Sequence, residues 1–167
     1  MKRLLAILVG VAALGPAPAF AVVPPNCGVD ATIAPMGGAE IGAGVVDPTG
    51  ASQRVRVRAR RAKLRLFIVD ATNTGAEADA FALDATVDAP STAVMVSDGP
   101  TDATSDAQAG VYASAPVAAS ATHRFVIWMR PFTTGPYGDV RSVTLAVSCK
   151  GAASPPDTVI AEIKVRR

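Results

Sequence analysis

Arginine occupies every second position of the segment RVRVRAR, from Arg54 to Arg60. Because side chains alternate between the two faces of an extended strand, Arg54, Arg56 and Arg58 would share one face, with about 7 Å between successive residues. Such a row can hold phosphate or carboxylate groups through bidentate hydrogen bonds, which makes it a candidate site for an anion or an acidic glycan. The alternative is a solvated face that pairs loosely with neighbouring carboxylates and protects a sheet edge from association.

The single tryptophan is the second candidate for contact with a ligand. On a strand, Trp128 would share a face with Arg124, Val126 and Arg130. An indole in that position can stack on a sugar ring, or it can simply pack between guanidinium groups. The packing interpretation needs no ligand, but we retain Trp128 with the arginine row as the candidate anion or glycan site.

Acidic side chains suggest metal or acid–base chemistry, but their spacing matches neither. Asp98, Asp102 and Asp106 offer the hard oxygen ligands that calcium prefers, although a four-residue spacing differs from the alternating ligands of known calcium loops. On a strand, Asp84 and Asp88 would lie about 13 Å apart, which is too far for the paired carboxylates of a glycosidase. The sequence therefore predicts no bound metal.

Histidine and methionine give no stronger indication of chemistry. General base catalysis near neutral pH most often uses histidine, and the only one, His123, has no evident orienting partner in the sequence. Together with Met36, Met95 and Met129 it could serve a copper carrier, but scattered methionines at inward strand positions are usually core residues. No nucleophile elbow, zinc-binding histidine pair or phosphate-binding glycine loop is present. We expect no enzymatic activity and no cofactor.

Cys27 and Cys149 are the only two cysteines, and they lie 122 positions apart. An even count in an oxidising compartment predicts one disulfide bond, here between the two ends of the mature chain. Closing so long a loop would stabilise the fold by about 4 to 5 kcal/mol as an upper figure. A redox or metal-binding pair is disfavoured, because neither cysteine lies in a Cys-x-x-Cys arrangement or near a histidine.

The compartment is indicated by residues 1–21. A basic start is followed by an unbroken apolar run over residues 4–14, and Ala19-Phe20-Ala21 supplies the small residues of a cleavage site. The run is shorter than the roughly 20 residues of helix that cross a bilayer. We therefore expect a signal peptide that is removed before Val22, a secreted, periplasmic or cell-surface location, and no transmembrane segment after cleavage.

Composition limits the remaining possibilities. Removal of residues 1–21 leaves 14 basic residues against 14 acidic ones, so the mature chain has none of the excess positive charge that a nucleic-acid partner requires. Residues 22–167 have the length of one ordinary domain. Hydrophobic residues make up 50% of the chain and aromatic residues only 5%, so we expect a core of many small contacts.

Alternation with a period of two along most of the chain predicts strands separated by turns. The clearest strand runs from Val140 to Cys149, and Thr122–Arg130 alternates in the same way until Pro131, which has no N–H to donate. A final strand covers residues 159–166. No amphipathic helix of useful length is apparent, so the pattern predicts an all-β sandwich. The expected inward side chains are Phe125, Ile127, Met129, Val143, Leu145, Val147, Val159, Ala161, Ile163 and Val165.

The alternation changes phase at Arg60-Arg61-Ala62, where we expect a turn or bulge. It would follow a strand that directs Val55, Val57 and Ala59 inward. The next strand would direct Leu64, Leu66 and Ile68 inward. That second strand leads into Asn73-Thr74-Gly75, where Asn and Gly tolerate the positive φ of a tight reversal.

The order of four landmarks resembles the immunoglobulin-like repeat modules of bacterial and archaeal surface proteins, including the cell-adhesion-related CARDB kind. The landmarks are Asn73-Thr74-Gly75, Asp79-x-Phe81-x-Leu83, the acidic turn at residues 98–102, and Ala109-Gly110-Val111-Tyr112. The resemblance covers residues 40–166. It implies a β-sandwich of seven to eight antiparallel strands that serves as a spacer, stalk or adhesion domain and carries no catalytic residues.

Taken together, the sequence predicts an exported, non-enzymatic immunoglobulin-like domain over residues 22–167 with a structural, adhesive or surface-assembly role. Its expected partners are other cell-surface proteins or glycans. The alternative is a small periplasmic or extracellular module that binds an acidic glycan or another anion. In that case the contacts would come from Arg54, Arg56, Arg58 and Trp128.

Overall fold

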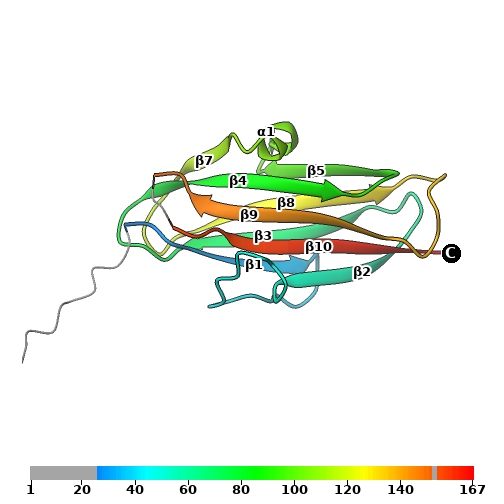
Figure 1. The fold of residues 1–167 in the computed structure, drawn as a ribbon, viewed down its shortest axis with the longest axis horizontal. Coiled ribbons are helices and arrows are strands. Elements are labelled where there is room, and N and C mark those ends of the chain that lie inside the picture. Colours follow the sequence, from blue (N-terminus) through cyan, green and yellow to red (C-terminus); the bar gives the residue numbers. More distant parts are fainter. Residues whose placement is uncertain (1–25, 152–153) are drawn as a thin grey trace, which may run out of the picture.

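A computed structural model describes residues 26–151 and 154–167, so the expected signal peptide lies outside the described residues. The described chain is a sandwich of two five-stranded sheets (Figure 1), which confirms the predicted all-β fold. Among the described residues, no helix is both long enough and apolar enough to cross a membrane. The elements are β1 (Val29–Pro35), β2 (Arg54–Arg60), β3 (Arg65–Asn73), β4 (Asp79–Asp88), β5 (Thr92–Asp98), β6 (Thr101–Asp102), α1 (Thr104–Gln108), β7 (Tyr112–Val117), β8 (Thr122–Pro131), β9 (Val140–Cys149) and β10 (Asp157–Arg166).

The strand order is that of an immunoglobulin-like domain with additions. Sheet A has the order β1-β3-β8-β5-β6 and sheet B the order β2-β10-β9-β4-β7. Strands β1, β3, β8 and β5 take the places of A, B, E and D in an immunoglobulin domain, and β4, β9 and β10 take those of C, F and G. Strand β2 pairs with β10 in parallel, whereas the other ladders are antiparallel. It therefore forms an extra edge on sheet B.

The core between the sheets follows the alternation seen in the sequence. On β8 and β9 the side chains predicted to point inward are buried, and Pro131 ends β8 as expected. Three phenylalanines are the largest apolar side chains in this core, and most of the others are valine and alanine, in agreement with the composition. The phenylalanines are Phe67, Phe81 and Phe125.

Strand β3 presents to the core the face opposite to the one expected from the sequence. Leu66 and Ile68 lie on the outer face of sheet A and are only half-buried, and Leu64 in the preceding turn is 41% exposed. Both faces of this strand are apolar near its start, so alternation alone does not decide between them. The polar Asp70 shares the face of Leu66 and Ile68 and indicates that this face points outward. The buried side chains are Phe67, Val69, Ala71 and Asn73.

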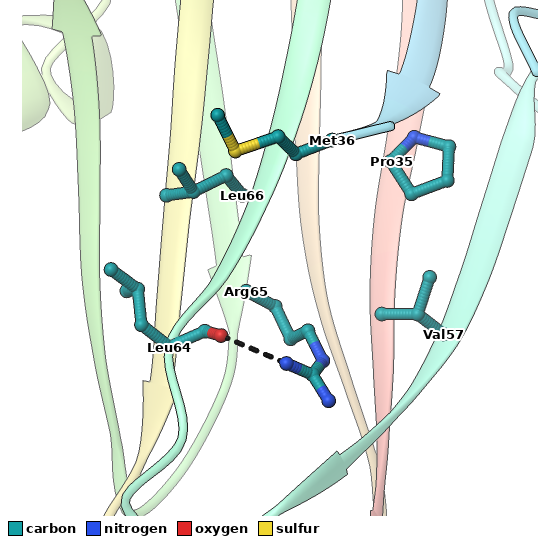
Figure 2. Close-up of a pocket in the computed structure, with 6 residues that line it drawn as sticks. All are labelled: Pro35, Met36, Val57, Leu64, Arg65 and Leu66. Carbon is teal, nitrogen blue, oxygen red and sulfur yellow. Dashed lines mark hydrogen bonds between the residues drawn. The ribbon is translucent and has the colours of Figure 1, made fainter. Parts of the chain in front are cut away.

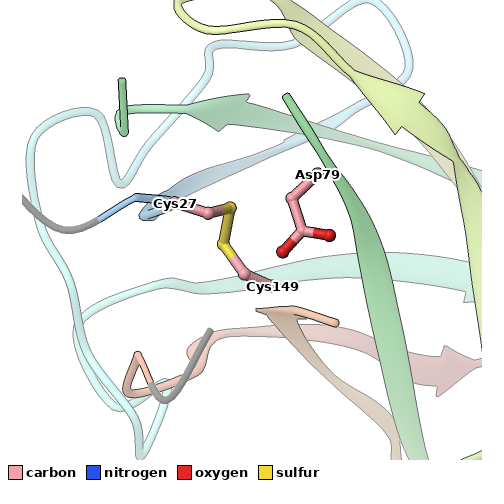
Figure 3. Close-up of side chains that lie close together, drawn as sticks. All are labelled: Cys27, Asp79 and Cys149. Carbon is pink, nitrogen blue, oxygen red and sulfur yellow. A yellow bond between two sulfur atoms is a disulfide. The ribbon is translucent and has the colours of Figure 1, made fainter. Parts of the chain in front are cut away.

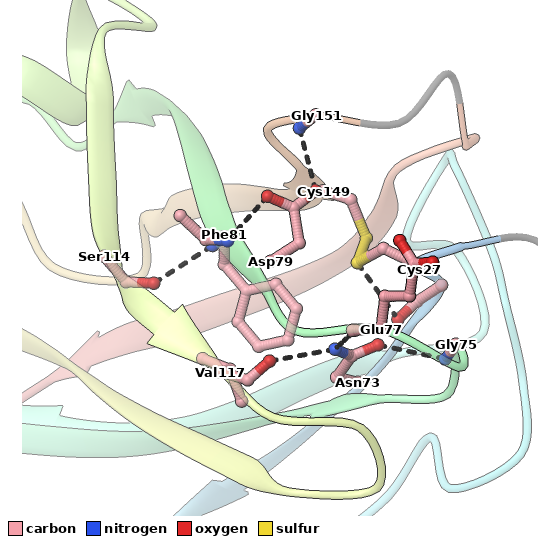
Figure 4. The surroundings of a disulfide bond; sticks show 12 residues. Cys27, Asn73, Gly75, Glu77, Asp79, Phe81, Ser114, Val117, Cys149 and Gly151 are labelled. Carbon is pink, nitrogen blue, oxygen red and sulfur yellow. Dashed lines mark hydrogen bonds between the residues drawn. A yellow bond between two sulfur atoms is a disulfide. The ribbon is translucent and has the colours of Figure 1, made fainter.

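The two turns that flank β3 occur where expected, but for different physical reasons. The reversal before β3 passes through Ala62, whose φ is 56°. At the other end a Cβ on Gly75 would lie 2.4 Å from the Cα of Cys27, so close packing requires this glycine rather than a positive φ. The carboxamide of the buried Asn73 donates to the carbonyls of Glu77 and Val117 and accepts from the N–H of Gly75 (Figure 4).

A buried carboxylate anchors the long connection between β1 and β2. Asp157, at the start of β10, accepts hydrogen bonds from the N–H of Ala31 at 2.6 Å, the N–H of Asp47 at 2.9 Å and Nε2 of Gln53 at 2.5 Å. Burial raises the pKa of Asp157, and these hydrogen bonds act in the opposite direction. One side chain thus holds β1, the connection and β10 together, and thereby fixes where β2 begins.

Candidate functional site

The two cysteines form the predicted disulfide bond (Figure 3). Their Cα atoms lie 6.1 Å apart, and Cys27 and Cys149 are only 1% and 4% exposed. The carboxylate of Asp79 lies beside the disulfide and accepts a hydrogen bond from the N–H of Gly151 at 2.8 Å. Within the described part of the chain, these three residues are the only close group of potential metal ligands. The two sulfur atoms are bonded to each other and offer no thiolate, so the cluster is structural.

His123 has the orienting partner that the sequence did not reveal. Its Nε2 lies 2.7 Å from Oδ1 of Asp98, and the hydroxyl of Tyr112 donates to Oδ2 of the same carboxylate at 2.8 Å. Burial, followed by the hydrogen bond to Asp98, raises the pKa of Tyr112 to about 12. The cluster joins β5, β7 and β8, and its polar groups are engaged with one another.

Two of the three aspartates considered for calcium bind other protein groups. Asp98 faces His123 and Tyr112, whereas Asp102 accepts from the N–H and hydroxyl of Thr104 at 2.9 and 2.5 Å. Those hydrogen bonds lower the pKa of Asp102. Asp106 lies on the first turn of α1. The arrangement is that of a turn and a short helix held by their own side chains.

The arginine row lies on β2, and one carboxylate engages two of its members. Arg54 and Arg56 contact Glu162 on β10 at 2.9 and 2.5 Å. Glu162 is 3% exposed although it lies on the outer face of sheet B. The pair raises the pKa of Arg56, through the hydrogen bond first and the opposite charge second. Two of the three predicted anion-binding residues are therefore partly neutralised within the protein.

Trp128 lies on the other sheet. Its strand, β8, belongs to sheet A, and its indole Nε1 donates to the hydroxyl of Ser97 on β5 at 3.0 Å. The arginine row projects from the edge strand of sheet B. The structure therefore does not bring Trp128 and the row of Arg54, Arg56 and Arg58 together into one site.

Trp128 instead belongs to an apolar surface that sequence reasoning missed. The pairing register places Leu66 opposite Trp128 and Trp128 opposite Met95, so three apolar side chains cross the outer face of sheet A in one row. The N–H of Met36 donates to the carbonyl of Leu66 at 2.9 Å, which extends the row beyond β3. We call this surface the apolar band. It comprises Met36, Leu64, Leu66, Met95, Trp128 and Phe132, of which Met36, Leu64 and Phe132 are 68%, 41% and 47% exposed.

Three adjoining hollows follow the apolar band. The first, of 390 Å³, opens between the edges of β1 and β2 and is lined by Pro35, Met36, Val57, Leu64, Arg65 and Leu66 (Figure 2). The second, of 380 Å³, shares Leu64 with the first and continues to Met95 and Trp128. The third, of 270 Å³, lies beside Phe132 and shares Ala62 and Arg130 with the second. The hollows thus form one continuous surface around the turn between β2 and β3.

Three basic residues adjoin the apolar band, and we call them the basic rim. Arg65 lines the first hollow, Arg130 lines the second and third, and Lys63 lies between Ala62 and Leu64 in the turn. Among the described residues, none of these side chains has a carboxylate within 4.0 Å. One of them, Arg65, lies in the first hollow and donates from Nε to the carbonyl of Arg58 at 3.2 Å. An apolar centre with a basic rim has a composition that is common in protein interfaces.

Comparisons with known proteins identify no family, and the likeness to solved structures concerns the fold alone. No protein-family model matches the chain, and no curated protein matches it. The N-terminal domain of PorA is 11% identical, with a TM-score of 0.50 over 81% of this chain and 97% of that domain. A family 123 glycoside hydrolase from Clostridium perfringens is 6% identical, with a TM-score of 0.48 over 69% of this chain, which spans 23% of the hydrolase. A PapD-like domain of human CEP192 is 8% identical, with a TM-score of 0.42 over 95% of this chain and 97% of the domain.

Proposed function

We propose that this chain is an exported, non-enzymatic immunoglobulin-like domain that docks onto another protein of the cell surface. The observation that carries the proposal is the apolar band with its three joined hollows and its unpaired basic rim. Soluble proteins rarely leave large contiguous apolar patches open to water unless another molecule covers them. A structural, adhesive or assembly role uses such a surface directly.

The chemistry of the rim defines the partner. Lys63, Arg65 and Arg130 are cationic, so the partner's contact surface is apolar at its centre and acidic at its margin. Charges of opposite sign across an interface speed association and exclude wrong partners. The same features suit a subunit of a surface assembly, as the resemblance to cell-adhesion-related modules implies. The buried disulfide fits the oxidising compartment to which a signal peptide would direct the chain.

Binding of an acidic glycan is the less supported alternative. Glu162 already engages Arg54 and Arg56, and Trp128 lies on the opposite sheet. A glycan site would therefore have to rely on Arg58 and its neighbours, without the aromatic platform that the sequence suggested. The apolar lining of the hollows gives a sugar few hydrogen-bonding partners.

Photo-crosslinking in the cells that make the protein tests the proposal. A photoreactive amino acid replaces Leu64 in the apolar band and, as the matched control, the exposed Thr86 on β4 of sheet B. We expect a protein adduct of one discrete mass from position 64 and none from position 86. Adducts of the same masses from both positions, or none from position 64, would contradict docking through the band.

A further inference from the structure

We propose that β2 is the strand on which the partner docks. An extended segment with alternating acidic and apolar side chains adds to the free edge of β2 and continues sheet B. This inference rests on the proposed function and specifies both the mode of binding and the chemistry of the bound segment. The evidence comes from the hydrogen bonding of β2, from its two faces and from its charge.

In the described part of the chain, no strand pairs with the edge of β2 that faces away from β10, although the carbonyls of Arg58 and Arg60 there accept from Nε of Arg65 and from the N–H of Lys63. Within the described chain, β10 is the only strand paired with β2. The N–H of Ile160 donates to the carbonyl of Gln53, and Ile160 stands opposite Arg54 in the parallel register. In a parallel ladder this pattern directs the backbone groups of the odd-numbered residues of β2 toward β10. The N–H and C=O groups of the arginines therefore point to the free edge, where a further strand would bind.

The two faces beside that edge differ in chemistry. Val57 faces the first hollow together with Leu64 and Leu66, so every second side chain of an added strand would enter apolar surroundings. The intervening side chains would lie beside the arginines on the outer face of sheet B. Among the residues that the structure describes, Glu162 is the only carboxylate within 4.0 Å of the basic residues between positions 54 and 65. Acidic side chains on the added strand supply the missing negative charge.

The arginines also exclude the most obvious alternative occupant, a second copy of β2. Edge-to-edge pairing of two copies would place the basic rows of both chains side by side, and like charges on neighbouring strands are destabilising. The row thus prevents self-association, as the sequence suggested, and at the same time selects a strand of opposite charge. Recognition by strand addition commonly combines backbone hydrogen bonds with side-chain pockets on alternate residues.

One side chain must move to admit the strand. Figure 2 shows the guanidinium of Arg65 directed toward β2, with a hydrogen bond of 3.2 Å to the carbonyl of Leu64. Its Nε also donates to the carbonyl of Arg58 on β2 at 3.2 Å. These hydrogen bonds are at the long end of the ordinary range and lie near solvent. On docking, Arg65 would exchange them for an acidic side chain of the partner, and the carbonyl of Arg58 would accept from the partner's backbone.

The test uses a capped, fluorescent peptide of the length of β2, in which Glu alternates with Val, and measures binding by anisotropy. Arg58→Pro removes the N–H that faces the free edge, while the hydrogen bonds to β10 remain, because proline is tolerated on an edge strand in this orientation. Arg58→Gln is the matched control, since it removes the same charge and keeps the N–H. Arg56→Pro with Arg56→Gln is a second pair. Circular dichroism and thermal unfolding show that each variant is folded.

We expect the wild type to bind the peptide and Arg58→Gln to bind it about two- to fivefold more weakly, as the loss of one exposed charge implies. Arg58→Pro should bind at least about tenfold more weakly than the wild type, because edge hydrogen bonds are lost as well. A peptide N-methylated on the residues that face β2 should not bind. Equal binding by Arg58→Pro and Arg58→Gln in folded protein, or by the methylated peptide, would overturn strand addition.

A sulfated polysaccharide is the second probe. If it binds and displaces the peptide equally well from the wild type and Arg58→Pro, the row is a general anion site and strand addition is wrong. The outcomes also separate the two proposals. If the wild type does not bind the peptide but position 64 still gives its cross-link, strand addition alone is wrong. If the cross-link is absent, the docking function is wrong whatever the peptide does.

Discussion

The carboxylate of Glu162 lies 2.5 Å from Nε of Arg56, the residue that stands directly opposite it in the parallel pairing of β10 with β2. The two partners differ sharply in their access to water, since the side chain of Arg56 is half-exposed and that of Glu162 is almost fully covered. The carboxylate has therefore lost its hydration and depends on Arg54 and Arg56 for compensation. Within the arginine face expected from the sequence, Glu162 holds Arg54 and Arg56, whereas Arg58 has no carboxylate within 4.0 Å among the described residues.

Replacing Arg54 and Arg56 with Gln should lower the free energy of unfolding by about 1 to 3 kcal/mol. Breaking a buried ion pair costs about 3 to 5 kcal/mol, and the exposure of the arginines reduces this figure. Denaturant titration measures the loss, and Arg58→Gln, which should stay within about 0.5 kcal/mol of the wild type, is the control. Adding Glu162→Gln to the double variant should restore most of the stability; if it restores none, Glu162 does not depend on the pair.

Removing the disulfide in the double variant Cys27→Ala with Cys149→Ala should destabilise the protein by about 2 to 5 kcal/mol, because the bond closes a long loop in the unfolded chain. Urea titration of the variant and the wild type measures the difference. Thiol titration of unfolded, unreduced wild type should detect no free thiol. Two reactive thiols per chain would show that the bond does not form.

Asp47 should contribute stability that is lost in acid. Hydrogen bonds from Ser52 and Thr49 hold the pKa of Asp47 well below its ordinary value of 3.8. A depressed pKa in the folded state adds stability that is complete above the unfolded pKa and disappears as the pH falls below about 4. The free energy of unfolding should therefore exceed that of Asp47→Asn by a constant amount near neutral pH, and the difference should shrink in acid.

The comparison with the variant is needed because Asp157 changes the free energy of unfolding with pH in the opposite direction. Burial raises the pKa of Asp157, so its contribution favours folding at low pH and declines as the pH rises through the folded pKa. Both proteins contain Asp157, and its effect cancels in the difference between them. A difference that does not change with pH would rule out the proposed role of Asp47.

Tyr112 should ionise about two pH units above an ordinary tyrosine, since its pKa is raised from 10.0 to about 12. Asp98→Asn should lower that pKa but leave it above 10.0, because burial is the larger cause and remains in the variant. Ultraviolet titration of tyrosinate in a Tyr137→Phe background isolates Tyr112, since the chain contains two tyrosines. An unchanged pKa in Asp98→Asn would show that the hydrogen bond to Asp98 does not form.

The orientation of β3 can be tested with neighbouring residues. Phe67→Ala should cost about 3 to 5 kcal/mol, as for other buried phenylalanines. Leu66→Ala should cost about 1 kcal/mol or less, because Leu66 faces outward and already contacts water. Denaturant titration of the two variants compares them directly. Equal losses, or a larger loss for Leu66→Ala, would mean that the strand presents the other face.

Alternation predicted the strands of this fold wherever one face is polar. Val143, Leu145 and Val147 alternate with small polar residues, so their burial could be read from the sequence. Leu66 and Ile68 alternate with equally apolar residues, so alternation predicts the wrong face for this strand. The same error hides the apolar band, because it places Leu64 and Leu66 in the core.

Contacts between residues distant in the sequence explain the other differences. Nothing near His123 in the chain indicates that Asp98 will face it, because the two meet only through the antiparallel pairing of β5 with β8. Likewise, Glu162 meets Arg56 only because β2 pairs with the last strand rather than with its sequence neighbours. The open edge of β2 follows from the same crossover. Local pattern reveals the strands, but only the assembled sheets show which strand is left without a neighbour.

The position of β10 between β2 and β9 determines when this domain can fold. β10 pairs with β2 on one side and with β9 on the other. Its first residue, Asp157, accepts a hydrogen bond from the N–H of Asp47 in the connection that leads into β2. A chain that emerges from a ribosome or a translocation channel with its amino end first must wait for residues 157–166 before sheet B can close. Until then β2 has no strand with which to pair, and sheet B covers its side of the core only in part. The topology thus prevents formation of the native state before β10 is available, and the slow pairing of distant strands extends that interval.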